Sequence, residues 1–202
     1  TSTLLLKHVL EQTRGAKVGL MGTMDNMIGN EAVPAQRTTP ESLDLQAMFA
    51  KMRDAGCTYA IMEVSSHAIS LDRVAGVPFA LAAFTNLTED HLDFHKTMEA
   101  YCDAKGTLFE RSEKHVANAD DPWCDRICKR TEKEVLLTSV NTKQGLHAED
   151  RELLSDGIRF TAVYGDQRVP VQLPIPGKFT VYNALTVLGC AMQLGITLEE
   201  AS

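Results

Sequence analysis

Two kinds of segment follow one another along this chain. In one kind the apolar residues form a short continuous run, and in the other they recur with helical spacing. The continuous runs are typical of strands buried on both faces of a sheet. They lie at residues 17–21, 59–64, 79–84, 115–119 and 134–137. Segments with helical spacing or helix-start residues are found at 1–12, 40–55, 98–109, from 121 onward and at 180–194. This order predicts an α/β fold with a mostly parallel sheet flanked by helices.

The segment after Thr39 and Pro40 shows a clear apolar helix face. Its apolar residues recur at positions i, i+3, i+4 and i+7, namely Leu45, Met48, Phe49 and Met52. Proline is tolerated at the first helical position, because its missing N–H would be unpaired there anyway. Gly56 follows as a candidate helix end. We therefore predict a helix that packs one face on the core.

The pattern changes after about residue 145. Apolar and polar residues alternate over 158–164 and again over 169–173, on either side of Gly165 and Asp166, which predicts an antiparallel hairpin. Thr197 and Glu200 then form a capping-box pattern for a last helix. Since the chain lacks an initiator Met, begins at a helix start and ends in a helix's first turn, we expect a domain cut from a longer enzyme.

Composition and charge exclude several classes of function. The 202 residues are 44% hydrophobic, which is ordinary for a globular protein. With 20 basic and 27 acidic residues the net charge is −7, so we expect neither nucleic-acid nor membrane-surface binding. No apolar run approaches the roughly 20 residues of a membrane span, and the first residues do not resemble a signal peptide. Five cysteines without a C-x-x-C pair suit reduced thiols in a cytoplasm.

The densest group of reactive side chains lies at Thr85–His95, directly after a predicted strand. It contains His91, Asp93 and His95, and ligands of open α/β sheets bind at such strand ends. A solvated loop with capping aspartates is the alternative. Glu63 favours a site, because it closes the preceding predicted strand and needs a cation or hydrogen bonds there. We expect the two strands to be neighbours, so that Glu63 and His91 meet at one edge, where they suit a divalent ion.

Lys105 lies on the apolar face of the helix predicted at 98–109. Burial would disfavour its ammonium form and lower its pKa, which leaves neutral amine able to react with carbon dioxide. Carbamylation would turn the cation into an oxygen ligand. Snorkelling of the side chain to solvent is the alternative.

Three further segments suggest anion binding. Thr38 and Thr39 precede a helix N-terminus, where hydroxyls and backbone N–H groups can bind an anion, although a plain helix cap is equally consistent. Arg73 can bind a phosphate with two nitrogens or pair with a nearby acid. Gly177-Lys178 is not a Walker phosphate loop, because the glycine that this motif requires is replaced by Gln172.

Several blocks together resemble the central domain of the Mur ligases, most closely the MurE type. The blocks are Thr38–Ser42, Glu63–His67, Arg73–Val74, Phe84–His95, Ala104–Lys105, Asn118–Asp121 and Gly177–Asn183. The resemblance extends over residues 1–202. It implies a truncated central domain that lacks the family's first strand and phosphate loop, while the N-terminal UDP-binding domain and the C-terminal domain lie outside it.

The resemblance also implies an activity. Such enzymes use ATP and Mg²⁺ to add diaminopimelate or lysine to UDP-N-acetylmuramoyl-L-alanyl-D-glutamate through an acyl phosphate, in cytoplasmic peptidoglycan synthesis. By resemblance, the magnesium ligands are Glu63, His91 and a carbamylated Lys105, with His91 and Lys105 also catalytic. By resemblance, the muramoyl substrate contacts Thr38, Thr39, Ser65 and Arg73, and Asn183 approaches the adenine. We expect a monomer, and a fragment that is inactive alone.

Two other functions are consistent with the same residues. A folylpolyglutamate synthase relative would share the fold and the modified lysine, although the Glu63–His67 block favours the muramoyl ligase. A metal-dependent hydrolase would use Glu63, His91, Asp93 and His95 without ATP.

Overall fold

The computed structural model describes all 202 residues, in eight helices and ten strands. The helices are α1 (Ser2–Arg14), α2 (Ser42–Asp54), α3 (Ser66–Ser70), α4 (Leu92–His95), α5 (Met98–Glu110), α6 (Cys124–Cys128), α7 (Lys178–Gln193) and α8 (Leu198–Ala201). The strands are β1 (Val18–Met21), β2 (Asp25–Ile28), β3 (Glu31–Pro34), β4 (Tyr59–Met62), β5 (Phe79–Phe84), β6 (Ser112–Asn118), β7 (Val135–Ser139), β8 (Leu146–Leu153), β9 (Ile158–Tyr164) and β10 (Gln167–Leu173).

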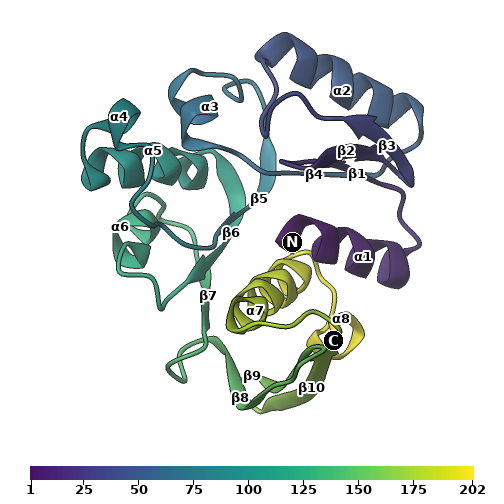
Figure 1. Cartoon of the computed structure of the whole chain (residues 1–202), viewed down its shortest axis with the longest axis vertical. Helices are drawn as coiled ribbons and strands as arrows, with labels where there is room; N and C mark the ends of the chain where they lie inside the picture. The colour runs from purple at the N-terminus through teal and green to yellow at the C-terminus, as the bar shows by residue number, and fades with distance from the viewer.

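The strands form two sheets (Figure 1). The larger sheet has the order β10-β9-β8-β7-β6-β5, parallel from β5 to β8 and antiparallel from β8 to β10. The smaller sheet has the order β3-β2-β1-β4, in which β1 and β4 are parallel. The predicted α/β class is thus confirmed, as is the hairpin at Gly165. The hairpin is not a separate unit, however, because β8 joins it to the parallel strands.

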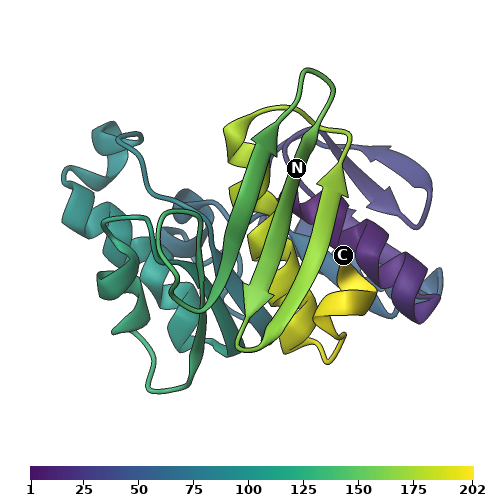
Figure 2. The same ribbon diagram turned by 90° about the horizontal axis from the view of Figure 1, so that it is seen from below.

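Helices cover both faces of the larger sheet. On one face α7 packs against β6, β7 and β8, and α1 lies alongside α7 (Figures 1 and 2). On the other face α5 and α6 pack near β5 and β6. Gly189 permits the close approach of α7, since a Cβ at this position would lie 3.0 Å from Val116. The N-terminal turns of α7 lie beside those of α1, where the Ser2 hydroxyl donates to the side-chain oxygen of Asn183 at 3.1 Å.

A smaller core lies between α2 and the four-stranded sheet. Leu45 and Met52 of the predicted apolar face are buried in it, beside Met21. The helix begins two residues later than the first helical position predicted at Pro40, because Glu41 keeps an extended backbone with φ −64° and ψ 155°. At the end of the chain, both hydrogen bonds of the predicted capping box of α8 are present.

The β2-β3 hairpin was not predicted. Its turn contains Gly29, which has φ +60°, but its strands are short and partly exposed, so they lack a continuous apolar run. None of the helices has the length and apolar character that crossing a lipid bilayer would require.

The prediction that the strands at 59–64 and 79–84 are neighbours buried on both faces is wrong. Strand β4 pairs only with β1 and β5 pairs only with β6, in different sheets. No residue of β4 is fully buried, and Ala80 and Ala83 of β5 are exposed. Each strand therefore keeps one edge whose N–H and C=O groups have no strand partner.

A substitution at Leu185 tests how much the packing of α7 in the main core stabilises the fold. The Leu185 side chain is 1% exposed and belongs to the largest apolar cluster. We expect Leu185→Ala to lower the free energy of unfolding by about 2–5 kcal/mol, because a cavity replaces the lost side chain. Urea unfolding of the chain followed by circular dichroism measures this. The control is Leu153→Ala, at a side chain that is 58% exposed, which should change stability by less than about 0.5 kcal/mol.

Candidate functional site

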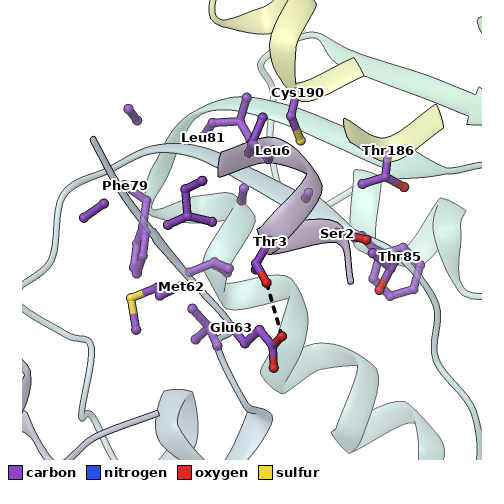
Figure 3. A pocket seen from close by; sticks show the side chains of 18 of the residues that line it. Ser2, Thr3, Leu6, Met62, Glu63, Phe79, Leu81, Thr85, Thr186 and Cys190 are labelled. Atoms are coloured by element: carbon purple, nitrogen blue, oxygen red, sulfur yellow. Dashed lines mark hydrogen bonds between the residues drawn. The ribbon is translucent and has the colours of Figure 1, made fainter. Parts of the chain in front are cut away.

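A cavity of about 730 Å³ lies between the free edges of β4 and β5 (Figure 3). Most of its lining is apolar and comes from the two strands, α1 and α7. Polar side chains line it near the carboxyl ends of the strands, at the starts of α1 and α7 and on α5, and they are Thr1, Ser2, Thr3, Glu63, Thr85, Asn86, Lys105 and Asn183. Thr58 and Thr186 line other parts of the cavity. The cavity is thus an apolar slot with a polar rim at the carboxyl end of the strands, where α/β folds bind ligands.

Glu63 has a well-defined set of hydrogen-bond donors. One carboxylate oxygen accepts from the backbone N–H of Thr23 at 3.2 Å and from its hydroxyl at 2.6 Å. The other oxygen accepts from the Thr3 hydroxyl at 3.4 Å, and Figure 3 shows these two side chains pointing toward each other. The donors come from α1 and from the loop after β1, so Glu63 connects both segments to the end of β4. These hydrogen bonds compensate in part for the water that the carboxylate loses on burial.

The residues predicted to bind substrate form a second group beside Glu63. The Thr39 hydroxyl donates to the backbone oxygen of Glu63 at 2.9 Å and accepts from the Ser65 N–H at 3.0 Å. Thr39 is only 1% exposed, so this hydroxyl holds the loop against the strand end. Ser65 caps α3 by accepting from the Ala68 N–H. Thr38 contacts the Thr23 hydroxyl at 3.2 Å.

Arg73 completes this group from the far end of α3. Its guanidinium pairs with Glu41 at 2.9 Å and donates to the backbone oxygen of Thr39 at 3.4 Å. Its Nε is buried without a partner. A buried guanidinium nitrogen left unpaired is costly, and an anionic ligand at this point would relieve the cost.

The loop after β5 brings its histidines into an aromatic cluster. We use this name for His67, His91, Phe94, His95 and Tyr101. The ring centres of the contacting pairs are 4.3–5.9 Å apart. Burial, followed by the neighbouring charges of His67 and His91, lowers the pKa of His95. His91 itself is exposed, with its side chain 3.5 Å from Asp90.

Lys105 lies half-buried on α5, between the cavity and the aromatic cluster. Its Nζ is 5.2 Å from the centre of the Tyr101 ring. Desolvation by burial lowers the pKa of its ammonium, while the charges of Asp90 and Cys102 act in the opposite direction. The side chain does not snorkel freely into solvent, which agrees with the prediction of a partly buried amine.

The donor groups supply only part of a metal site. No three His, Cys, Asp or Glu side chains lie close enough together to hold a metal ion. Glu63 and Lys105 line the cavity, whereas His91 does not, and an ammonium cannot coordinate a cation. A hard divalent ion prefers oxygen ligands. Glu63 fits such an ion, and Lys105 would fit it only as a carbamate.

Asn183 reaches the same rim from α7. Its side-chain oxygen accepts a hydrogen bond from the Ser2 hydroxyl at 3.1 Å, which ties α7 to the start of α1. Thr3 and Thr23, the hydrogen-bond partners of Glu63, were not predicted from the sequence. Thr23 could have been found, because it follows a predicted strand and so lies at the same sheet edge as Glu63. The bond from Thr3 depends on how α1 is placed in space.

The chain is similar in sequence to a known family and to several of its members. A family profile described as "Mur ligase middle domain" matches residues 1–191. The UDP-N-acetylmuramoyl-L-alanyl-D-glutamate–2,6-diaminopimelate ligase of Clostridium botulinum is 44% identical over 199 residues, which are 98% of this chain and 41% of that protein. The ligase of the same name from Clostridium tetani is 46% identical over 200 residues, again 98% and 41%. The chain thus spans about two fifths of these relatives.

Solved structures show the same fold. A structure of a UDP-N-acetylmuramoyl-L-alanyl-D-glutamate–2,6-diaminopimelate ligase matches with a TM-score of 0.91 and 28% identity, over 100% of this chain and 42% of that one. An FPGS–AMPPCP complex matches with a TM-score of 0.73 and 18% identity, over 98% and 58%. The second match shows a shared fold alone.

The lowered pKa of Lys105 gives a direct test. We expect its amine to react with an amine-specific acylating reagent at lower pH than the ε-amine of Nα-acetyl-lysine, because desolvation favours the neutral form. Competitive labelling across a pH series, read by mass spectrometry of the Lys105 peptide, measures the titration. A midpoint at or above that of the free amine would contradict the burial of this group.

Proposed function

Because this chain belongs to the Mur ligase middle-domain family, we propose that the full-length protein is an ATP-dependent amide ligase of cytoplasmic peptidoglycan synthesis. It would add diaminopimelate to UDP-N-acetylmuramoyl-L-alanyl-D-glutamate, the reaction named for its relatives. The observation that carries this proposal is the polar rim of the cavity, which Glu63, Lys105 and Asn183 all line.

The slot between β4 and β5 would be filled by a β-strand in the full-length protein. Both edges are unpaired and the slot between them is mostly apolar, which suits a strand that hydrogen-bonds on both sides. Thr1 lines the slot, so the segment before it is well placed to enter. Such a strand would lead into α1 through a short turn. The backbone N–H groups of this turn and of the helix N-terminus would suit the binding of ATP phosphates.

The residues of the polar rim would bind the metal ion and the nucleotide. Glu63, held by Thr3 and Thr23, and a carbamylated Lys105 would provide oxygen ligands for Mg²⁺, and His91 would provide a nitrogen ligand. Mg²⁺, when bound, neutralises charge that develops on phosphate oxygens during phosphoryl transfer. Asn183 would approach the adenine of ATP.

The second group would hold the muramoyl substrate. Arg73, with one nitrogen unpaired, would bind an anionic group, while Thr38 and Ser65 would add hydroxyls beside it. Thr39 would act mainly by holding this loop, since its hydroxyl is already used. The substrate carboxylate would take the γ-phosphoryl group of ATP to form an acyl phosphate and ADP. The incoming amine would attack its carbonyl carbon, and phosphate and a proton would leave as the amide forms.

Lys105 tests the ligase function in the full-length protein. We expect Lys105→Ala to lower turnover by at least about 100-fold, because the variant lacks one of the proposed metal ligands. We also expect added short carboxylic acids to restore part of the lost turnover. The assay follows amide product and ADP together. The control is Lys129→Ala, at an exposed lysine outside the rim, with unchanged turnover. Hydrolysis of the substrate without ATP, or full turnover in Lys105→Ala, would contradict the proposal.

The strand in the slot has its own test. Hydrogen–deuterium exchange of β4 and β5 should be slower in the full-length protein than in this 202-residue chain, because added hydrogen bonds protect edge amides. Strand β10, at the far edge of the larger sheet, is the internal control. Equal exchange of β4 and β5 in the two proteins would show that no strand enters the slot.

A further inference from the structure

Two cysteines of α6 face each other within a single helical turn. Cys124 and Cys128 are four residues apart, so their side chains lie on the same face of the helix. Their Sγ atoms are 3.8 Å apart, and neither takes part in a disulfide. We propose that the two thiols together bind one soft, thiophilic metal ion. Neither cysteine lines the cavity, so this site is separate from the polar rim and does not depend on the proposed ligase function.

The sulfur–sulfur distance favours a shared ion over a disulfide. Two thiolates that bind one ion tetrahedrally, with metal–sulfur bonds of about 2.3 Å, lie about 3.8 Å apart. The two Sγ atoms already have this separation. A disulfide instead requires the Cβ atoms to approach to about 3.5–4.5 Å, whereas Cβ atoms four residues apart on a helix are separated by about 5–6 Å. An ion is therefore bound without a change in the helix, which a disulfide would distort.

Contacts with α5 hold the turn that contains the two thiols. Ile127, which lies between the cysteines in the sequence, is fully buried in the apolar cluster that α6 shares with α5. Arg126 donates to both carboxylate oxygens of Asp103, at 2.8 and 2.7 Å. Arg130, just after the helix, pairs with Glu110 at 2.6 Å. Because the turn is fixed in this way, the thiols lose little conformational freedom when an ion binds.

The electrostatic surroundings suit a thiolate and a cation. A hydrogen bond from the Cys124 thiol lowers the pKa of Cys128, although burial acts in the opposite direction. The same hydrogen bond, together with burial, raises the pKa of Cys124. The carboxylates of Asp121 and Asp125 lie close enough to act on the charge of Cys124, and their negative charge attracts a cation. The neighbouring guanidinium groups are already paired with carboxylates of α5.

The binding step requires an open side and the loss of two protons. Cys124 is 4% exposed and Cys128 is half-buried, so the ion reaches the pair from the side of Cys128. Both S–H protons pass to solvent as two sulfur–metal bonds form. No third His, Cys, Asp or Glu side chain completes the site. Water or a small thiol therefore takes the remaining positions, as at metal sites that keep an open position.

The test titrates the reduced 202-residue chain with Cd²⁺, a soft ion whose bonds to thiolates absorb in the ultraviolet. We expect this absorption to saturate at one Cd²⁺ per chain. In Cys124→Ser and in Cys128→Ser the affinity should fall at least about 100-fold, because a single thiolate remains. The matched control is Cys57→Ser, which removes a partly buried thiol beside the smaller core and should bind Cd²⁺ as the parent does. Circular dichroism shows whether each variant is folded.

A second measurement needs no substitution. Bound Cd²⁺ should slow alkylation of Cys128 by iodoacetamide at least about 10-fold, because the thiolate that reacts is the one that binds the ion. Alkylation of Cys57 should not change, and mass spectrometry of the two peptides measures both rates. Parent affinity in either α6 variant, an equal loss in Cys57→Ser, or unprotected Cys128 in the parent would overturn the site. None of these outcomes bears on the ligase function, which is tested by amide formation.

Discussion

The unpaired edges of β4 and β5 dominate this structure. Backbone N–H and C=O groups that face an apolar slot need partners, and here neither strand provides them to the other. The two sheets are therefore held together by helices rather than by a continuous ladder of hydrogen bonds. Helix α1 contacts β1 and β4 on one side and α7 on the other, so it joins the smaller sheet to the larger one.

This constraint also decides where chemistry can occur. Parallel strands direct their carboxyl ends to one edge, and the segments after β1 and β4 bring Thr23 and Glu63 together there. The starts of α1 and α7 reach the same edge, through Thr3 and Asn183. Polar groups from four segments thus surround the mouth of an apolar slot, where a charged ligand would find donors without crossing the core.

At the carboxyl ends of β4 and β5, the segments that follow the two strands contact each other through side chains. Helix α3, which follows β4, packs against α5, which follows β5. The aromatic cluster lies at this contact, with His67 from the first segment and Tyr101 from the second. Stacked rings restrict one another more than flexible aliphatic chains do, which suits a place where loops must hold reactive groups.

Local patterns in the sequence were sufficient for the long helices α1, α2, α5 and α7, for strands β1, β4, β5, β6 and β7, for the hairpin at Gly165 and for the capping box at Thr197, because each depends on neighbours a few residues away. They also identified Glu63 and Lys105 as side chains in unusual surroundings. The relation between β4 and β5 could not be read in this way. Both have the composition of central strands, but strand pairing depends on segments distant in sequence, and only the tertiary structure shows their edges unpaired. The same holds for the bond from Thr3 to Glu63 and for the ring contacts of Tyr101, since each requires helices and loops to be placed in space before the side chains can meet.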